Sequence, residues 1–185
     1  MASGSERGSI IIHSTSSNNI EYRADNVFAD GVSGLCYLPN GSGLVACGWD
    51  EDDGANLKVL SPSLELVQTL VGHGGDVECV TVSPSGSHFA SCDVYGKMII
   101  WSEPGEGGEW ARVQVLEDHT SWIKSVCFSP DGKQLAGYWK PRQSHQPLQL
   151  QRGKCHLSAH VGGPHQLGPV PLVLSRLQTP LLCRK

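Results

Sequence analysis

The residues best suited to chemistry in residues 1–137 are two histidines, His73 and His119. Either could act as a general base, but no motif supplies a Ser or Cys nucleophile together with an orienting carboxylate. We therefore expect both histidines to be structural, hydrogen-bonded to Ser91 or to backbone between strands. The sequence predicts no catalytic residue.

Two other groups of side chains suggest metal ions. Cys155, His156, His160 and His165 offer sulfur and nitrogen, but not as paired ligands at short fixed spacing inside a folded module, as zinc sites require. The run Asp50–Asp53 offers carboxylates without the alternating spacing and distant Glu of a calcium loop. We expect no metal and no cofactor, and interpret the acidic run as a solvated connection that helps to repel wrong partners.

Three tryptophans are candidates for protein binding. Trp49 lies at a strand-to-loop junction, and Trp110 and Trp122 lie near the ends of expected strands. Exposed aromatic residues beside acidic loops would suit a basic peptide. Packing of these rings between neighbouring sheets is the alternative.

The elements that carry these residues form an internal repeat. Pro39, Pro84 and Pro130 each follow a short strand pattern and precede a glycine by two positions, at Gly41, Gly86 and Gly132. The repeat is therefore 45 to 46 residues long, the length of a four-stranded propeller blade. Pro-x-Gly ends a strand because proline cannot donate to a ladder and glycine accepts the positive φ of a tight turn. Helical periodicity is absent from residues 1–137.

The pairs Gly72-His73 and Ile100-Trp101 make the repeat resemble the WD40 repeat family, which implies a β-propeller that serves as a scaffold. The resemblance also implies a hydrogen-bonded set of His, Ser or Thr, Asp and Trp in a blade. His73, Ser91 and Trp101 match three members, and Tyr95 stands where we expect the Asp. In the blade before it, Leu60 replaces the Trp.

We predict an all-β fold comprising a partial WD40 propeller of about three blades, too short to close, followed by a disordered tail. The expected organisation is a flexible N-terminus (1–8) and a repeat region (9–137), within which a half-blade (9–28), two blades (32–71 and 77–116) and a half-blade (119–137) follow one another. The exposed strand edges of the half-blades lead us to expect self-association.

Residues 138–185 have a different composition. All 18 acidic residues precede Tyr138 and seven of the 14 basic residues follow Gly137, so the net charge is −11 before residue 138 and +7 from there on. The tail is rich in Pro, Gln and His and lacks strand or helix periodicity, so we expect disorder. Aberrant splicing or a frame error is our preferred explanation, with an evolved basic tail as the alternative.

The function that this pattern favours is a non-catalytic scaffold, or a truncated isoform of one, that binds other proteins. The acidic front of the chain argues against direct nucleic-acid binding, and no apolar run is long enough to span a membrane. Weaker resemblances point to an And-1-like propeller of chromatin and replication, or to a WD protein of cytosolic iron–sulfur assembly. A regulatory propeller fragment of a larger enzyme complex is a further alternative.

The seven cysteines predict a reducing compartment, cytoplasmic or nuclear, because their number is odd and no CxxC pair occurs. Because no disulfide framework is needed, we expect a thiol reductant to leave the folding of the repeat region unchanged. Paired thermal melts with and without dithiothreitol test this, and a clear fall on reduction would point to a structural disulfide.

Overall fold

The computed structural model describes residues 1–50, 56–103, 108–139 and 154–160, and within them the chain forms only strands and connections. No helix in this part of the chain is long and apolar enough to cross a membrane. The strands make four antiparallel sheets, with three strands in the first and last and four in the second and third. In chain order they are β1 (Ala2–Gly4), β2 (Ile10–His13), β3 (Ile20–Ala24); β4 (Gly31–Tyr37), β5 (Leu44–Trp49), β6 (Leu57–Leu60), β7 (Leu66–Thr69); β8 (Val77–Val82), β9 (His88–Asp93), β10 (Met98–Ser102), β11 (Ala111–Leu116); and β12 (Ile123–Phe128), β13 (Gln134–Trp139), β14 (Lys154–His160).

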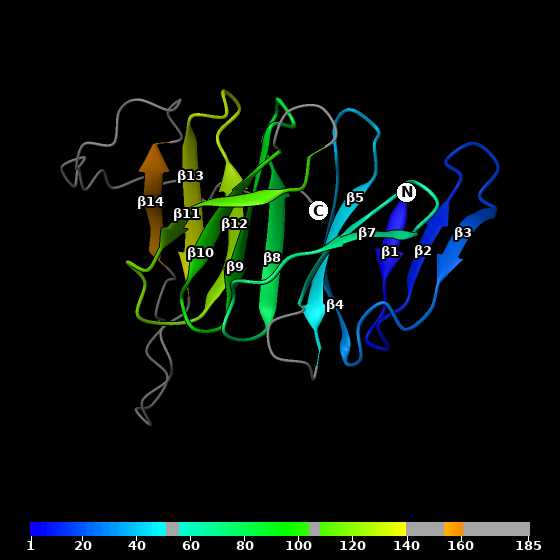
Figure 1. Cartoon of the computed structure of the whole chain (residues 1–185), viewed down its shortest axis with the longest axis horizontal. Helices are drawn as coiled ribbons and strands as arrows, with labels where there is room; N and C mark the ends of the chain where they lie inside the picture. The colour runs from blue at the N-terminus through cyan, green and yellow to red at the C-terminus, as the bar shows by residue number, and fades with distance from the viewer. Residues whose placement is uncertain (51–55, 104–107, 140–153, 161–185) are drawn as a thin grey trace.

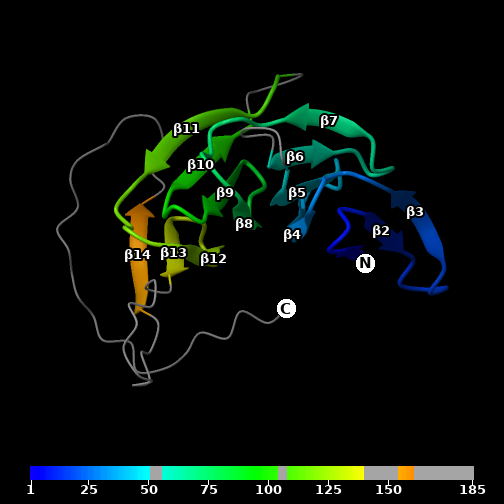
Figure 2. The same ribbon diagram turned by 90° about the horizontal axis from the view of Figure 1, so that it is seen from below.

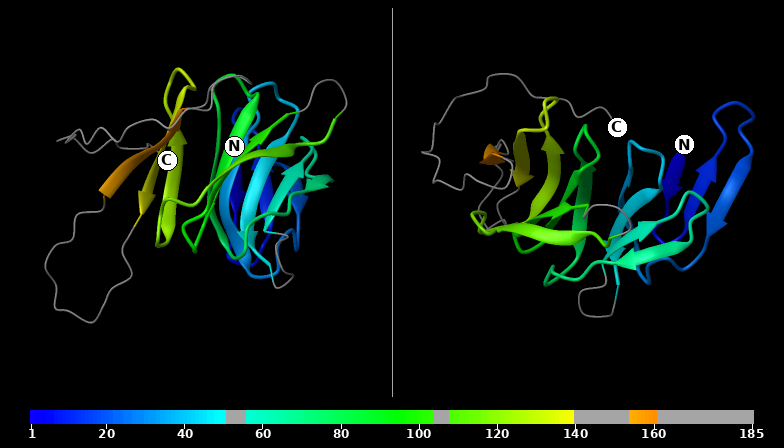
Figure 3. Two further views of the ribbon diagram at one scale, coloured as in Figure 1. Left: turned by 60° about the vertical axis from the view of Figure 1, so that its left-hand side comes forward. Right: turned by 45° about the horizontal axis from the view of Figure 1, so that its top comes forward.

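The four sheets stand side by side around an open arc (Figure 2). Strands β4, β8 and β12 lie on the inside of the arc, and β3, β7 and β11 lie on the outside. Each four-stranded sheet is strongly twisted, so β7 and β11 run across the direction of β4 and β8 (Figures 1 and 3). This is the arrangement of neighbouring propeller blades, and it confirms the predicted all-β class with four-stranded antiparallel sheets.

The repeated Pro-x-Gly turns join the first and second strands of three sheets. Gly41, Gly86 and Gly132 all have a positive φ, of 75°, 78° and 72°. A side chain would be strained in this conformation, which explains why the same residue type recurs at the repeat spacing.

Strand alternation gives the middle sheets two buried faces. In β10, Ile99 and Trp101 face the second sheet, whereas Met98 and Ile100 face the fourth. Successive side chains of a strand point to opposite faces, so one apolar strand can supply both interfaces.

Three apolar clusters fill the three junctions between sheets. The junction of the first two sheets contains Ile10, Ile12, Phe28, Leu44, Ala46, Leu60 and Leu64. The next contains Leu38, Val45, Cys47, Leu57, Val59, Leu70, Val77, Val80, Phe89, Ile99, Trp101 and Trp110. The last contains Ala90, Cys92, Met98, Ile100, Ile123, Val126 and Leu135. The core is therefore divided among the junctions and lies between the sheets.

The structure differs from the sequence analysis at both ends of the repeat region. Residues 2–4, expected in a flexible N-terminus, form β1 and pair with β2, and the Met1 ammonium group donates to the His13 carbonyl. Residues 154–160, expected in a disordered tail, form β14 and pair with β13. Both strands lack β-branched alternation and are held by backbone pairing, which composition does not reveal. The rest of the tail after Trp139 lies outside the described residues.

The end sheets of the arc each have a face against which no further sheet packs in the described chain (Figure 2). Exposed sheet faces and edges recruit other chains. We predict that the purified protein is a dimer or larger, and light scattering after size-exclusion chromatography tests this. A monodisperse monomer near its chain mass of 19.9 kDa would contradict the prediction.

Candidate functional site

Four polar side chains form a buried hydrogen-bonded set between the second and third sheets. His73 Nδ1 lies 2.9 Å from Asp93 Oδ2, and His73 Nε2 lies 2.6 Å from Ser91 Oγ. The indole N–H of Trp101 donates to the same Ser91 oxygen at 2.9 Å. One tautomer satisfies every donor: Nδ1–H donates to the carboxylate and Nε2 accepts from the Ser91 hydroxyl.

The sheet places these residues by its register and its turns. Ser91 pairs with Ile99 in the middle of β9 and β10, and Trp101 follows two residues later on the same face. His73 lies on the connection from β7 to β8, and Asp93 ends β9. Strand, turn and connection therefore meet at one end of the third sheet.

Asp93 is the acidic member of this set, and the prediction that Tyr95 stands in its place is wrong. The other carboxylate oxygen of Asp93 accepts the backbone N–H groups of Tyr95 and Lys97, at 3.0 and 2.9 Å. The Tyr95 side chain is 62% exposed. An aspartate that accepts a hydrogen bond from the backbone two residues ahead forms an Asx turn. The sequence signal that could have identified Asp93 is an Asp at the end of a strand pattern, three residues before Gly96.

Ser91, His73 and Asp93 have the order of contacts found in a hydrolase triad, but they are sealed. The side chains of His73 and Asp93 are each 1% exposed, and Ser91 is 0% exposed. The Ser91 oxygen is also occupied by the Trp101 N–H. Two surface hollows, of about 460 and 220 Å³, are lined by other residues. The set therefore fastens the connection that leaves the second sheet to the third sheet, and it offers no nucleophile to a substrate.

The Asp93 carboxyl is held in its charged form. Burial alone would raise its pKa, but the hydrogen bonds from His73 and from the backbone N–H groups of Lys97 and Tyr95 outweigh burial and lower the pKa below its usual value.

The preceding junction uses different chemistry at the equivalent place. Phe28, 45 residues before His73, is buried, and Lys58 Nζ lies 4.5 Å from its ring centroid. Lys58 also donates to the Val27 carbonyl and forms an ion pair with Asp50 at 2.8 Å. A cation over an aromatic ring thus replaces the histidine-centred set.

At the following junction, His119 is 8% exposed. Its backbone packs against Gly96, since a Cβ at Gly96 would lie 2.4 Å from the His119 carbonyl oxygen. Gly137, 46 residues after Ser91, has no hydroxyl, and a Cβ there would lie 3.6 Å from His119 Nε2. The complete four-residue set therefore belongs to the third sheet.

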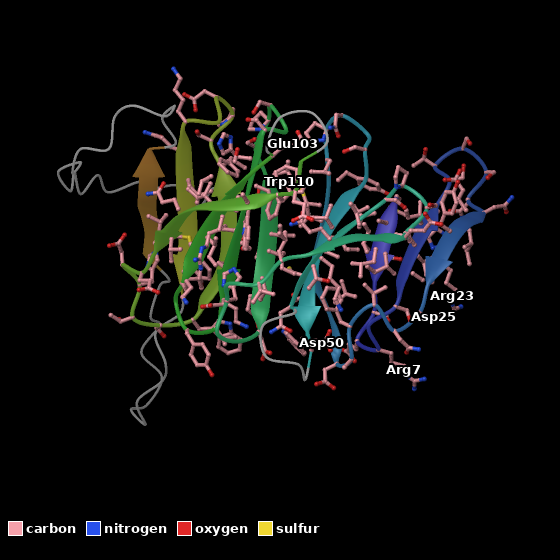
Figure 4. The ribbon with its side chains drawn as sticks, viewed as in Figure 1. Arg7, Arg23, Asp25, Asp50, Glu103 and Trp110 are labelled. Atoms are coloured by element: carbon pink, nitrogen blue, oxygen red, sulfur yellow. The ribbon has the colours of Figure 1, made fainter. Side chains whose placement is uncertain are left out.

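The three candidate tryptophans have different environments. Trp49 is 38% exposed at the end of β5. Trp110, expected near an exposed edge, is only 8% exposed. Its ring centroid lies 4.7 Å from that of Phe89, and its backbone N–H and carbonyl each form a hydrogen bond with the Gln68 side chain. Trp122 is half-buried beneath Lys124. Figure 4 shows Asp50, the residue after Trp49, and Trp110 at opposite ends of the sheets.

The candidate metal ligands lie in two segments, residues 50–53 and residues 155–165. No group of three or more metal-binding side chains occurs within the described residues. The backbone of Cys155, His156 and His160 lies in β14, and His165 lies outside the described residues. The acidic run beyond Asp50 also lies outside them.

The family model "WD domain, G-beta repeat" matches residues 64–102 and 110–139. These two stretches contain the complete buried set and the junction after it. Both stretches are WD40 repeats. One WD40 chain in a structure titled "Crystal Structure of Mitotic Checkpoint Complex" superimposes with a TM-score of 0.62 at 20% identity, over 74% of this chain and 41% of that one. This likeness supports the propeller fold.

Curated WD40 relatives bear several different names. A probable cytosolic iron-sulfur protein assembly protein 1 of Sclerotinia sclerotiorum is 38% identical over 45% of this chain and 18% of its own length. A ribosome biogenesis protein WDR12 homolog of Chlamydomonas reinhardtii is 38% identical over 59% and 26%. The small ribosomal subunit protein RACK1 of Drosophila melanogaster is 30% identical over 79% and 44%. The chain thus spans less than half of each of these relatives.

We predict that Asp93 contributes to stability at neutral pH. Because its pKa is lower in the folded protein than in the unfolded chain, its contribution is present above the unfolded value, near 3.8, and is lost as the pH falls through the lower folded value. Asp93→Asn should therefore lower the melting temperature at pH 7 more than at pH 3. Asp30, an exposed aspartate, provides the matched control as Asp30→Asn. Equal losses at both pH values for Asp93→Asn would contradict the prediction.

Proposed function

We propose that this chain is a non-catalytic WD40 scaffold that binds segments of other proteins. The sealed Ser91–His73–Asp93 set carries this proposal. The arrangement that would suit hydrolysis on a surface is buried here, where it joins the third sheet to the connection from β7. Surface loops and strand edges are then the parts of the molecule left for recognition.

The surface that best suits a partner lies at the His73 end of the sheets. Trp49, which is 38% exposed, ends the second strand of its sheet, and Tyr95, which is 62% exposed, lies just after the second strand of the neighbouring sheet. Asp30 and Asp76 are exposed on connections at the same end, and the Asp76 carbonyl accepts the N–H of Val94 beside Tyr95. Aromatic rings among carboxylates favour a basic segment that contributes Lys or Arg.

The names of the relatives support a scaffold without selecting a pathway. Proteins named for iron–sulfur assembly, ribosome biogenesis and the small ribosomal subunit match at comparable identity. We propose a cytoplasmic or nuclear location, as these names suggest. An And-1-like role or a regulatory role in an enzyme complex has no comparable support.

An array of basic, neutral and acidic 15-residue peptides tests the binding surface. We expect basic peptides to be retained, and Trp49→Ala to weaken binding of the retained peptides about tenfold, as loss of a contact worth about 1.4 kcal/mol would do. Leu66→Ala, which removes a 60% exposed side chain on β7, should leave binding unchanged. Thermal melts establish that both variants fold.

Two results would contradict the proposal. Equal weakening by Leu66→Ala, or retention of acidic peptides alone, would exclude the Trp49 surface. Turnover of an activated ester by the wild-type chain, abolished in Ser91→Ala, would exclude a non-catalytic role.

A further inference from the structure

Two cysteines stand directly opposite one another in the third sheet. Cys79 in β8 and Cys92 in β9 are Cα partners in the antiparallel ladder. Directly opposed residues in such a ladder have Cα atoms about 4.5 or 5.5 Å apart, and both values lie within the range of about 4.4–6.8 Å that a disulfide spans. Neither cysteine is in a disulfide in this structure.

Both thiols also point to the same junction, the one between the third and fourth sheets. Cys92 Sγ lies 3.7 Å from the Cys79 carbonyl oxygen and 3.6 Å from that of Ile123. Cys79 Sγ lies 4.0 Å from the Val126 carbonyl oxygen. Because both sulfurs approach carbonyls of β12, they occupy the same side of the ladder.

Each of the other cysteines in the described ladders faces a residue of another type. Cys36 is opposite Val45, Cys47 is opposite Gly34 and Cys127 is opposite Ala136. Cys79 and Cys92 are therefore the one pair of opposed thiols among the described strands.

We propose that Cys79 and Cys92 form a modification site, a dithiol that a peroxide oxidises to an intrachain disulfide. Cys79 is the attacking group, because it is half-buried whereas Cys92 is fully buried. The hydrogen bond with the Cys92 thiol lowers the pKa of Cys79 to about 6, and the same contact, with burial, raises the pKa of Cys92 well above its usual value. The lowered pKa favours the thiolate form of Cys79, which is the form that attacks a peroxide.

The reaction balances with hydrogen peroxide as the oxidant. The Cys79 thiolate attacks one peroxide oxygen and becomes a sulfenic acid while hydroxide leaves. The Cys92 sulfur then attacks the Cys79 sulfur, the S–O bond breaks, and the departing hydroxide takes up the Cys92 proton as water. Overall, two thiols and one hydrogen peroxide give one disulfide and two waters.

The sequence makes this pair easy to follow by mass spectrometry. Trypsin cleavage after Lys58 and Lys97 releases residues 59–97, in which Cys79 and Cys92 are the only cysteines. After limited peroxide treatment of the folded chain, N-ethylmaleimide is added in urea. We expect the oxidised peptide to carry no alkyl group and to weigh two hydrogen atoms less than the reduced, unalkylated peptide. It should form about tenfold faster than the cysteines elsewhere are oxidised. Chymotrypsin cleavage after Phe89 then yields two fragments joined by the disulfide.

Controls separate the fold from general thiol reactivity. Cys36→Ser should leave the oxidation of residues 59–97 unchanged, and oxidation in urea should abolish its preference over the other cysteines. Cys92→Ala should prevent the linked fragments. The wild-type result stands even if that variant fails to fold.

Three results would overturn the proposal. They are full alkylation of residues 59–97 while other cysteines are consumed, linkage of Cys79 or Cys92 mainly to a different cysteine, and the same preference in urea as in the folded chain.

Discussion

The middle sheets of this molecule are apolar on both faces, and the structure depends on how that surface is covered. In β9 and β10, alternate side chains point to the second sheet and to the fourth, and almost all of them are buried. A sheet of this kind cannot be stable alone, because either face left in water would lose the burial that stabilises it. The stability of each blade is consequently shared with its neighbours, and the junction is the natural unit of the fold.

The His73-centred set enters its junction with the hydrogen bonds of its side chains satisfied. The His73-centred set uses the contacts of a catalytic triad, but the Trp101 indole takes the remaining position on Ser91 Oγ and the surrounding apolar cluster excludes water. The Ser91–His73 and His73–Asp93 contacts therefore serve packing in this buried position, and the same contacts would serve catalysis only at an open surface. Burial decides between the two uses, and distance alone does not.

The sequence specified the repeat well and the ends of the arc poorly. The Pro-x-Gly spacing located three turns, and the apolar patterns located the strands around them. Tyr95 was predicted at the position of the aspartate because repeat spacing alone does not show that Asp93 ends its strand and accepts hydrogen bonds from its own turn. β1 and β14 were missed because Ala2–Gly4 and Lys154–His160 pair through backbone, for which side-chain pattern carries little signal. The burial of Trp110 depends on Phe89 and Gln68, which are 21 and 42 residues away in the chain, and such contacts follow from sheet packing.

The turn at Gly96 has a geometric consequence for the whole arc. Its α-carbon approaches the His119 carbonyl so closely that a methyl group would lie 2.4 Å from the oxygen, and its φ is 93°. This contact joins the third sheet to the connection that enters the fourth, so it limits how closely these two sheets can approach each other at this end. A side chain at this position would push the connection that carries His119 away from the turn. The spacing of neighbouring sheets in the open arc therefore depends here on a residue without one.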